Sequence, residues 1–211
     1  MTILKRTLPV LLALMTAALP LAAQDKHCHQ ASAPKAVAGG TAQQVSGLDI
    51  PDLRIYDQDG KSRRFYSELV EGKVVVMNFM FTTCTTICPP MGANFGKLQQ
   101  RLGARLGHDV FLLSVSVDPA VDTPQRMKAW GAQFGRRPGW TLVTGPKSRI
   151  DEILKALKVF TPDKNDHAST VLLGNDPAGR WTRANGLAAP EQLIAIIDEL
   201  AAETAQVEAG Q

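Results

Sequence analysis

The stretch KVVVMNFMFTTCTTICPPM, residues 73–91, indicates the fold class of this chain. Its first part, Lys73–Phe81, is a nearly unbroken apolar run, which is typical of a strand that is covered on both faces. Pro89 stands where a helix could begin, and apolar residues recur at helical spacing after it. A buried strand that leads through a short loop into a helix is the building unit of α/β proteins.

Strands and helices continue to alternate along the rest of the chain. Strands are expected over residues 109–118 and 140–145. Three helices are expected: one that begins at Asp122 or Thr123, one over 147–159 and one over 188–203. A hairpin is expected over 167–186, turning at 175–179, and two short strands are expected over 48–69 around a turn at 57–60. These patterns predict an α/β fold with a mixed central sheet, helices on both faces and an N-terminal strand or hairpin extension.

Composition and charge narrow the class of protein. A chain of 211 residues predicts one domain with appendages, and an apolar content of 45% can supply a core. The net charge of +3 includes Lys5 and Arg6, which belong to an apparent targeting segment. Without these two, 21 basic residues face 20 acidic ones, so there is no electrostatic basis for binding nucleic acid.

The N-terminus has the layout of a secretory signal peptide. Lys5 and Arg6 precede an apolar run over residues 8–23, and Ala22 and Ala23 offer a cleavage site. The run is short for a membrane span, although an uncleaved inner-membrane anchor is the alternative. We therefore expect an extracytoplasmic, periplasmic protein. The expected segments are a signal peptide (1–23), a flexible linker (24–46), a folded domain (47–205) and a disordered tail (206–211).

Cys84 and Cys88 fall in the loop after the first long strand, at or before a helix start. The positive end of the helix dipole favours a thiolate there, and a thiolate is both a nucleophile and a metal ligand. If the helix begins inside the loop, residues four apart share one face and both sulfurs can meet. The pair could be a structural disulfide, a redox pair or part of a metal site. A disulfide closing so short a loop would stabilise the fold only modestly.

His167 is the candidate third ligand, because a thioredoxin-like sheet places the loop before its hairpin beside the helix that carries the cysteines. Two thiolates and one imidazole form a soft donor set that suits Cu(I), whereas structural zinc prefers four ligands. Asp166 either orients His167 or is a turn residue. In the linker, Cys28 stands between His27 and His29 and is either a mobile copper-capturing site or an untethered cysteine.

Three segments resemble the Sco/SenC family of copper-binding proteins. They are FTTCTTICPPM (81–91), SVSVDPAVDTP (114–124) and DHAST (166–170), and the resemblance covers about residues 48–203. It implies a thioredoxin-like fold that carries one Cu(I) or Cu(II) ion on Cys84, Cys88 and His167. Asp118 belongs to the second segment and is expected to shape the loop near the site rather than to bind metal.

The resemblance also implies a function. Family members help to build the dinuclear copper centre of cytochrome c oxidase subunit II by delivering copper, by reducing that subunit's cysteines, or by both. The expected function is therefore a copper metallochaperone whose partners are that subunit or a similar copper-receiving protein, other copper chaperones and thiol reductants.

The alternatives are a thiol-disulfide oxidoreductase, with Cys84 attacking and Cys88 resolving, and a peroxide-reducing enzyme. The chain departs from the family pattern at Thr85 and Thr86, where many members have Pro-Asp, so the electrostatics of the sulfurs are expected to differ. Many members are also anchored by an N-terminal span, whereas this N-terminal segment has the layout of a cleavable signal.

Overall fold

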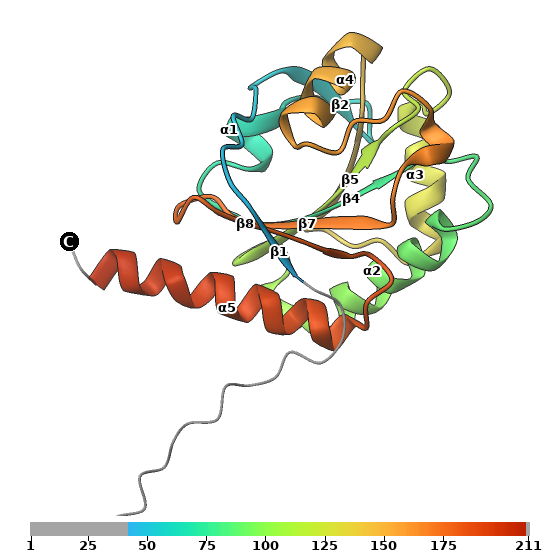
Figure 1. Ribbon diagram of the computed structural model, residues 1–211. Helices are drawn as coiled ribbons and strands as arrows, with labels where there is room; N and C mark the ends of the chain where they lie inside the picture. Colours follow the sequence, from blue (N-terminus) through green and yellow to red (C-terminus); the bar gives the residue numbers. More distant parts are fainter. Residues whose placement is uncertain (1–41, 210–211) are drawn as a thin grey trace, which may run out of the picture. The chain divides into compact units, whose positions relative to one another are not determined.

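The fold is organised around one fully buried strand, β4 (Val74–Met80). A computed structural model describes residues 42–209 of the chain (Figure 1). β4 pairs in parallel with β5 (Val110–Ser116) and antiparallel with β7 (Thr170–Asn175). Valine, methionine and phenylalanine fill both faces of β4, as the apolar run at 73–81 predicts.

The remaining strands extend this centre into an eight-stranded mixed sheet in the order β1-β8-β7-β4-β5-β6-β2-β3. The other five strands are β1 (Gln43–Val45), β2 (Arg54–Asp57), β3 (Ser62–Arg64), β6 (Trp140–Thr144) and β8 (Arg180–Asn185). Only the β4–β5 and β5–β6 pairs are parallel. The expected mixed sheet and the expected N-terminal hairpin, β2–β3, are thus confirmed.

Helices cover both faces of the sheet, as expected (Figure 1). They are α1 (Phe65–Leu69), α2 (Cys88–Leu102), α3 (Pro124–Gln133), α4 (Lys147–Ala156) and α5 (Pro190–Ala209), with short 3-10 helices η1 (Gly103–Arg105) and η2 (Lys164–Asp166). Side chains of α2, α3 and α5 pack with Val76 and Met80 of β4 in one core cluster. Side chains of α1 and α4 pack with Met77 and Phe79 in a second cluster on the other face.

Two of the expected segment boundaries differ from the structure. β1 lies inside the segment 24–46, which was expected to be a linker, and pairs with the edge strand β8. This three-residue strand is defined by main-chain pairing with β8. Two of its residues are Gln43 and Gln44, so the sequence shows no apolar alternation from which a strand could be predicted. At the other end, α5 continues to Ala209, because the residues of the expected tail include good helix formers.

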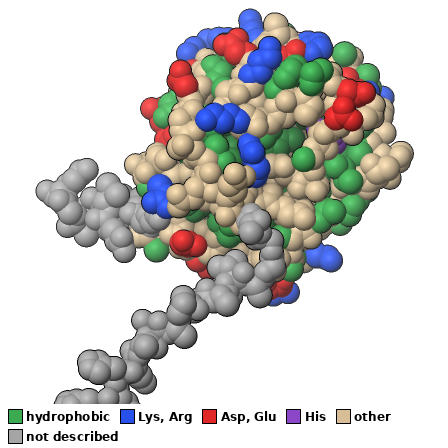
Figure 2. All heavy atoms as spheres, viewed as in Figure 1, with side chains coloured by type: hydrophobic (Ala, Val, Ile, Leu, Met, Phe, Trp, Pro, Cys, Tyr) green, Lys and Arg blue, Asp and Glu red, His purple; other side chains and the backbone are tan. Residues whose placement is uncertain are grey.

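The predicted signal peptide and the His27–Cys28–His29 segment lie outside the described residues. Within residues 42–209, no helix is long and apolar enough to cross a membrane. On the face shown in Figure 2, lysine and arginine side chains are interspersed with aspartate and glutamate and do not form a continuous basic area.

Candidate metal and thiol site

The two cysteines meet at the start of α2, but not through the helical spacing that the sequence suggested. Cys88 is the first residue of α2, while Cys84 belongs to the loop that precedes it. The backbone N–H of Cys88 donates to Cys84 Sγ at 3.4 Å. Because the first N–H groups of a helix have no partner within the helix, the sulfur of Cys84 takes the place of a capping oxygen. Both cysteines are free thiols and both are buried.

The two thiols hold their protons with different strength. Burial alone would raise the pKa of Cys84, but hydrogen bonds from the Cys88 thiol, from the N–H groups of Cys88 and Thr86 and from the Thr86 hydroxyl together lower it below its usual value. The pKa of Cys88 is raised to about 12. Burial is the larger cause, and the hydrogen bond to Cys84 is the second. The pair therefore loses its first proton from Cys84, which is the better nucleophile.

His167 lies against the second cysteine. Its Nε2 atom is 3.8 Å from Cys88 Sγ, and the residue is only 6% exposed. Its Nδ1 atom is 2.7 Å from the backbone carbonyl oxygen of Lys164. A carbonyl oxygen can only accept, so Nδ1 carries a hydrogen, and Nε2 is the ring nitrogen that faces Cys88 Sγ. A neutral ring with its hydrogen on Nδ1 has a lone pair on Nε2, which is the atom that can bind a metal ion.

Asp118 and Lys164 hold the turn that carries His167. Lys164 Nζ is 2.5 Å from Asp118 Oδ2, which joins the loop after β5 to η2. The same ammonium group lies 5.2 Å from the ring centre of Phe81, whose ring meets His167 edge-on at 5.5 Å. The expectation that Asp118 shapes the loop near the site is consistent with this pair. Lys164 and Phe81 were not predicted, since nothing in their local sequence distinguishes them from a turn lysine and a core aromatic.

Asp122 fixes the beginning of the cysteine loop. Its carboxylate accepts hydrogen bonds from the backbone N–H and the hydroxyl of Thr82 at 2.9 and 2.5 Å, and from the Ser116 hydroxyl at 2.6 Å. The sequence left Asp122 and Thr123 as alternative helix caps. Thr123 is the cap, because its side chain accepts from Arg126 N at 3.3 Å. Because Asp122 does not cap α3, its carboxylate can accept the hydrogen bonds from Thr82 that hold the loop carrying the thiols.

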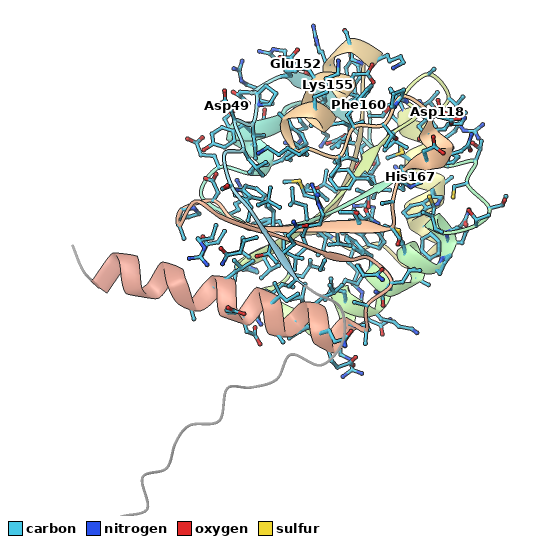
Figure 3. The ribbon with its side chains drawn as sticks, in the orientation of Figure 1. Asp49, Asp118, Glu152, Lys155, Phe160 and His167 are labelled. Atoms are coloured by element: carbon cyan, nitrogen blue, oxygen red, sulfur yellow. The ribbon has the colours of Figure 1, made fainter. Side chains whose placement is uncertain are left out.

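Asp166 is a turn residue. It ends η2 and is exposed, whereas the ring of His167 is oriented by the Lys164 carbonyl. Figure 3 shows His167 at the end of the sheet, with Asp118 on a neighbouring loop.

The expected ligands adjoin one another in pairs, Cys84 with Cys88 and Cys88 with His167. Within residues 42–209, however, no three Cys, His, Asp or Glu side chains already stand in an arrangement that could hold a metal ion. A shared ion would therefore require these side chains to turn toward it. The donor set itself, two sulfurs and one imidazole nitrogen, is soft and suits Cu(I).

The fold and the site together define a class of protein: a thioredoxin-like domain with a thiol pair at the start of the helix that follows its central strand. The chain belongs to the SCO1/SenC family, whose model matches residues 50–202. The SCO1 protein homolog of Bacillus subtilis is 33% identical over 150 residues, which cover 67% of this chain and 76% of that protein.

Two further relatives have informative descriptions. A putative copper-binding protein of Stutzerimonas stutzeri is 32% identical over 114 residues, about half the length of each protein. The solved structure of BsSco, described as a member of the Sco family of cytochrome c oxidase assembly proteins with a disulfide switch, is 30% identical. It matches with a TM-score of 0.59 and covers 75% of this chain and 98% of that one.

Proposed function

We propose that this protein is an extracytoplasmic copper metallochaperone that binds one copper ion through Cys84, Cys88 and His167. Its role is to assist assembly of the dinuclear copper centre of a cytochrome c oxidase. The observation that carries the proposal is the 3.8 Å approach of His167 Nε2 to Cys88 Sγ, beside the sulfur of Cys84. Family membership and the copper-binding and oxidase-assembly descriptions of its relatives support it.

The protein has two tasks in this proposal: to collect a single soft ion and to release it. Three soft ligands favour Cu(I) over the harder divalent ions, and a three-ligand site leaves one side open to an incoming ligand of the client. Cys84 supplies the more acidic thiol, so it is the first sulfur available to the metal at neutral pH. The Lys164 carbonyl holds the ring through Nδ1, so that Nε2 stays on the side of Cys88.

A thiol-disulfide exchange function is the second candidate, and the unequal acidity of the two cysteines favours it. The Cys84 thiolate would attack a disulfide of the client and form a mixed disulfide while one client thiolate leaves. Cys88 would then lose its proton and displace the second client thiolate, so that the client gains two electrons and Cys84–Cys88 becomes a disulfide. An external thiol reductant would restore the pair.

The test of the proposal is the copper stoichiometry and the Cu(I) competition affinity of the reduced protein. We expect one ion bound tightly, loss of tight binding in Cys84→Ser, and weaker binding in His167→Ala. His108→Ala is the matched control, because His108 is exposed and lies just before the opposite end of β5. Equal affinities in His167→Ala and His108→Ala would contradict the assignment of the third ligand.

A cellular assay separates the two candidate functions. Oxidase activity would be measured in cells that depend on Cys84→Ser, Cys88→Ser or His167→Ala protein. Copper delivery predicts that all three substitutions impair oxidase assembly. If His167→Ala supports normal activity while either cysteine substitution abolishes it, thiol exchange is the function.

A further inference from the structure

A second pocket adjoins His167 and is not used by the copper site proposed above. It has a volume of about 190 Å³ and includes His167 in its wall. Phe79, which also lines it, packs in the core cluster on the α4 face of the sheet, whereas Cys88 packs in the cluster on the α2 face. The pocket therefore lies on the α4 side of the sheet, and the thiols lie on the α2 side.

Two cations line this pocket without an acidic partner. Among the ion pairs of the described residues, neither Lys158 nor Arg183 takes part in one. Arg183 Nη2 donates to the Lys158 carbonyl at 2.8 Å, and Lys158 Nζ donates to the Ser46 carbonyl at 2.7 Å. The Nε–H group of Arg183 is buried and has no acceptor among the described groups. Asp166 also lines the wall, so the charged residues of the lining are two basic side chains and one acidic side chain.

Lys158 is held in a backbone conformation that disfavours it. Its φ of 58° is the only positive φ at a non-glycine residue among residues 42–209. It follows the last turn of α4, where Lys158 N bonds to Lys155 O and Val159 N bonds to Leu154 O. This is the helix C-terminal motif in which glycine is usual at that position. A lysine at this position destabilises the fold relative to glycine, and such an outlier motivates a search for a function of its side chain.

The rest of the wall suits a short apolar chain that ends in an acidic group. Phe79 and Phe160 supply aromatic surface, and Figure 3 shows Phe160 between Lys155 of α4 and His167. Lys155 Nζ lies 4.9 Å from the centre of the Phe160 ring, so a third positive charge lies close to a lining residue. Charge-assisted hydrogen bonds from ammonium and guanidinium groups are the strong contacts that proteins use for carboxylates.

We propose that this pocket binds a carboxylate, namely the side chain of a glutamate or aspartate that the client protein presents. The methylene stem would lie against Phe79 and Phe160, and the carboxylate would bind Lys158 and Arg183. Because His167 forms part of the wall, a client held here would have its metal-receiving atoms near the copper ligands. This inference names the chemistry of the partner and rests on the proposed function.

The experiment uses sodium propionate, which has the chemistry of a glutamate side chain, and propionamide, its uncharged isostere. Each is titrated into the reduced, metal-free protein at constant ionic strength. NMR then follows the Arg183 Nε–H and the backbone amides of Lys158 and Thr170. We expect saturable shifts with propionate in the millimolar range and none with propionamide. Equal responses to both compounds would overturn the proposal.

Two variants and one control define the site further. Arg183→Gln is expected to weaken propionate binding at least fivefold. Lys158→Gly is expected to weaken it too while raising the melting temperature, because glycine relieves the backbone strain. Lys97→Gln removes a charge from an exposed position on α2 and should leave propionate binding unchanged. If Arg183→Gln binds propionate like the wild-type protein, the pocket is not a carboxylate site.

Inorganic phosphate distinguishes a free oxyanion from a client side chain. Phosphate that binds more tightly than propionate and displaces it would identify a site for a free oxyanion and overturn the assignment to a client. The titrations need no copper, so they are independent of the proposed function. Tight copper binding without propionate binding would refute this inference alone, and propionate binding without copper binding would refute the proposed function alone.

Discussion

Cys84 and Cys88 are the same kind of residue, four positions apart, yet the protein shifts their pKa values in opposite directions. Cys84 lies outside the helix, so its sulfur accepts the N–H of Cys88 and a negative charge on it is stabilised. Cys88 is the first helical residue and is fully buried, so its charged form is disfavoured. Because α2 begins at Cys88, this residue is buried within the helix and Cys84 lies just before it, and this difference in position explains the opposite directions of the two pKa shifts.

Alkylation rates test this difference. In reduced, metal-free Cys28→Ser protein treated with iodoacetamide near pH 7, Cys84 is expected to react at least about tenfold faster than Cys88, since one pKa unit changes the thiolate fraction about tenfold. The rate at Cys84 should rise with pH and level off once the pH exceeds its lowered pKa, while the rate at Cys88 should still rise. Peptide mass spectrometry would measure both.

The control for this measurement is the protein unfolded in guanidinium chloride, where the two cysteines should react at similar rates. Similar rates in the folded protein as well would show that the start of α2 does not differentiate them.

At the scale of elements, the site depends on three connections that meet at one end of the sheet. The loop after β4 carries Cys84, the loop after β5 carries Asp118, and the turn η2 before β7 precedes His167. The parallel β4–β5 pair brings the first two loops to the same edge. The Asp118–Lys164 ion pair then fastens the third segment to the second.

Breaking this ion pair is expected to misplace His167. In Asp118→Asn, Lys164 loses its charged partner, so η2 should become more mobile and Cu(I) affinity should fall severalfold. The Cys84 alkylation rate should stay unchanged, because neither residue contacts the thiols. Competition titration measures the affinity, and line broadening of the His167 Nδ1–H signal reports the position of the ring independently of copper.

Asp151→Asn is the matched control, because it removes an equivalent ion pair to Lys147 on the exposed side of α4. Asp118→Glu should largely restore the affinity. A copper affinity in Asp118→Asn equal to that in Asp151→Asn would mean that the pair does not position His167.

At the scale of the whole molecule, stability comes from two core clusters on the opposite faces of one sheet. Asn78 is a polar exception in the middle of β4. It is fully buried, and neither its amide nitrogen nor its amide oxygen has a hydrogen-bond partner among the described groups. A buried polar group without a partner costs roughly 1–3 kcal/mol. The central strand therefore carries an amide that destabilises the fold.

Replacing Asn78 by valine is expected to raise the free energy of unfolding by about 1 kcal/mol, because valine needs no partner and suits a buried strand. Urea denaturation measures this change. Ser114→Val on the neighbouring β5 is the control, and it is expected to lower the free energy of unfolding. The Ser114 hydroxyl accepts from Trp140 Nε1 at 3.0 Å, and this donor would lose its acceptor. If Asn78→Val lowers stability instead, the amide has a partner such as a buried water.

The sequence predicted most of the fold, because the hydrophobic patterns of β4, β5 and α4 follow from burial on one or both sides, and a cap residue followed by proline marks the start of α3. It did not predict β1, whose pairing rests on main-chain hydrogen bonds and not on a side-chain pattern. It also placed the start of α2 at Pro89, one residue after its first helical residue, Cys88, because proline is a stronger local signal than cysteine.

The candidate site was predictable only in part. The proximity of His167 to Cys88 follows from motif and topology. Asp122 and Lys164 act on segments that are distant along the chain, and no local pattern encodes such contacts. The pocket beside His167 is formed by side chains from β4, β8 and the segment after α4, and no local sequence pattern encodes their proximity.

His167 follows Cys88 by 79 positions along the chain, although Cys88 Sγ and His167 Nε2 lie only 3.8 Å apart. During synthesis the two thiols emerge together, well before the imidazole. The imidazole can reach them only after β7 has paired with β4, a contact between distant parts of the chain that forms late in folding. The newly made chain therefore passes through a stage in which both thiols are present and the imidazole is not yet beside them. Under the copper-binding role proposed above, tight copper binding is therefore expected only of a chain that has completed its sheet.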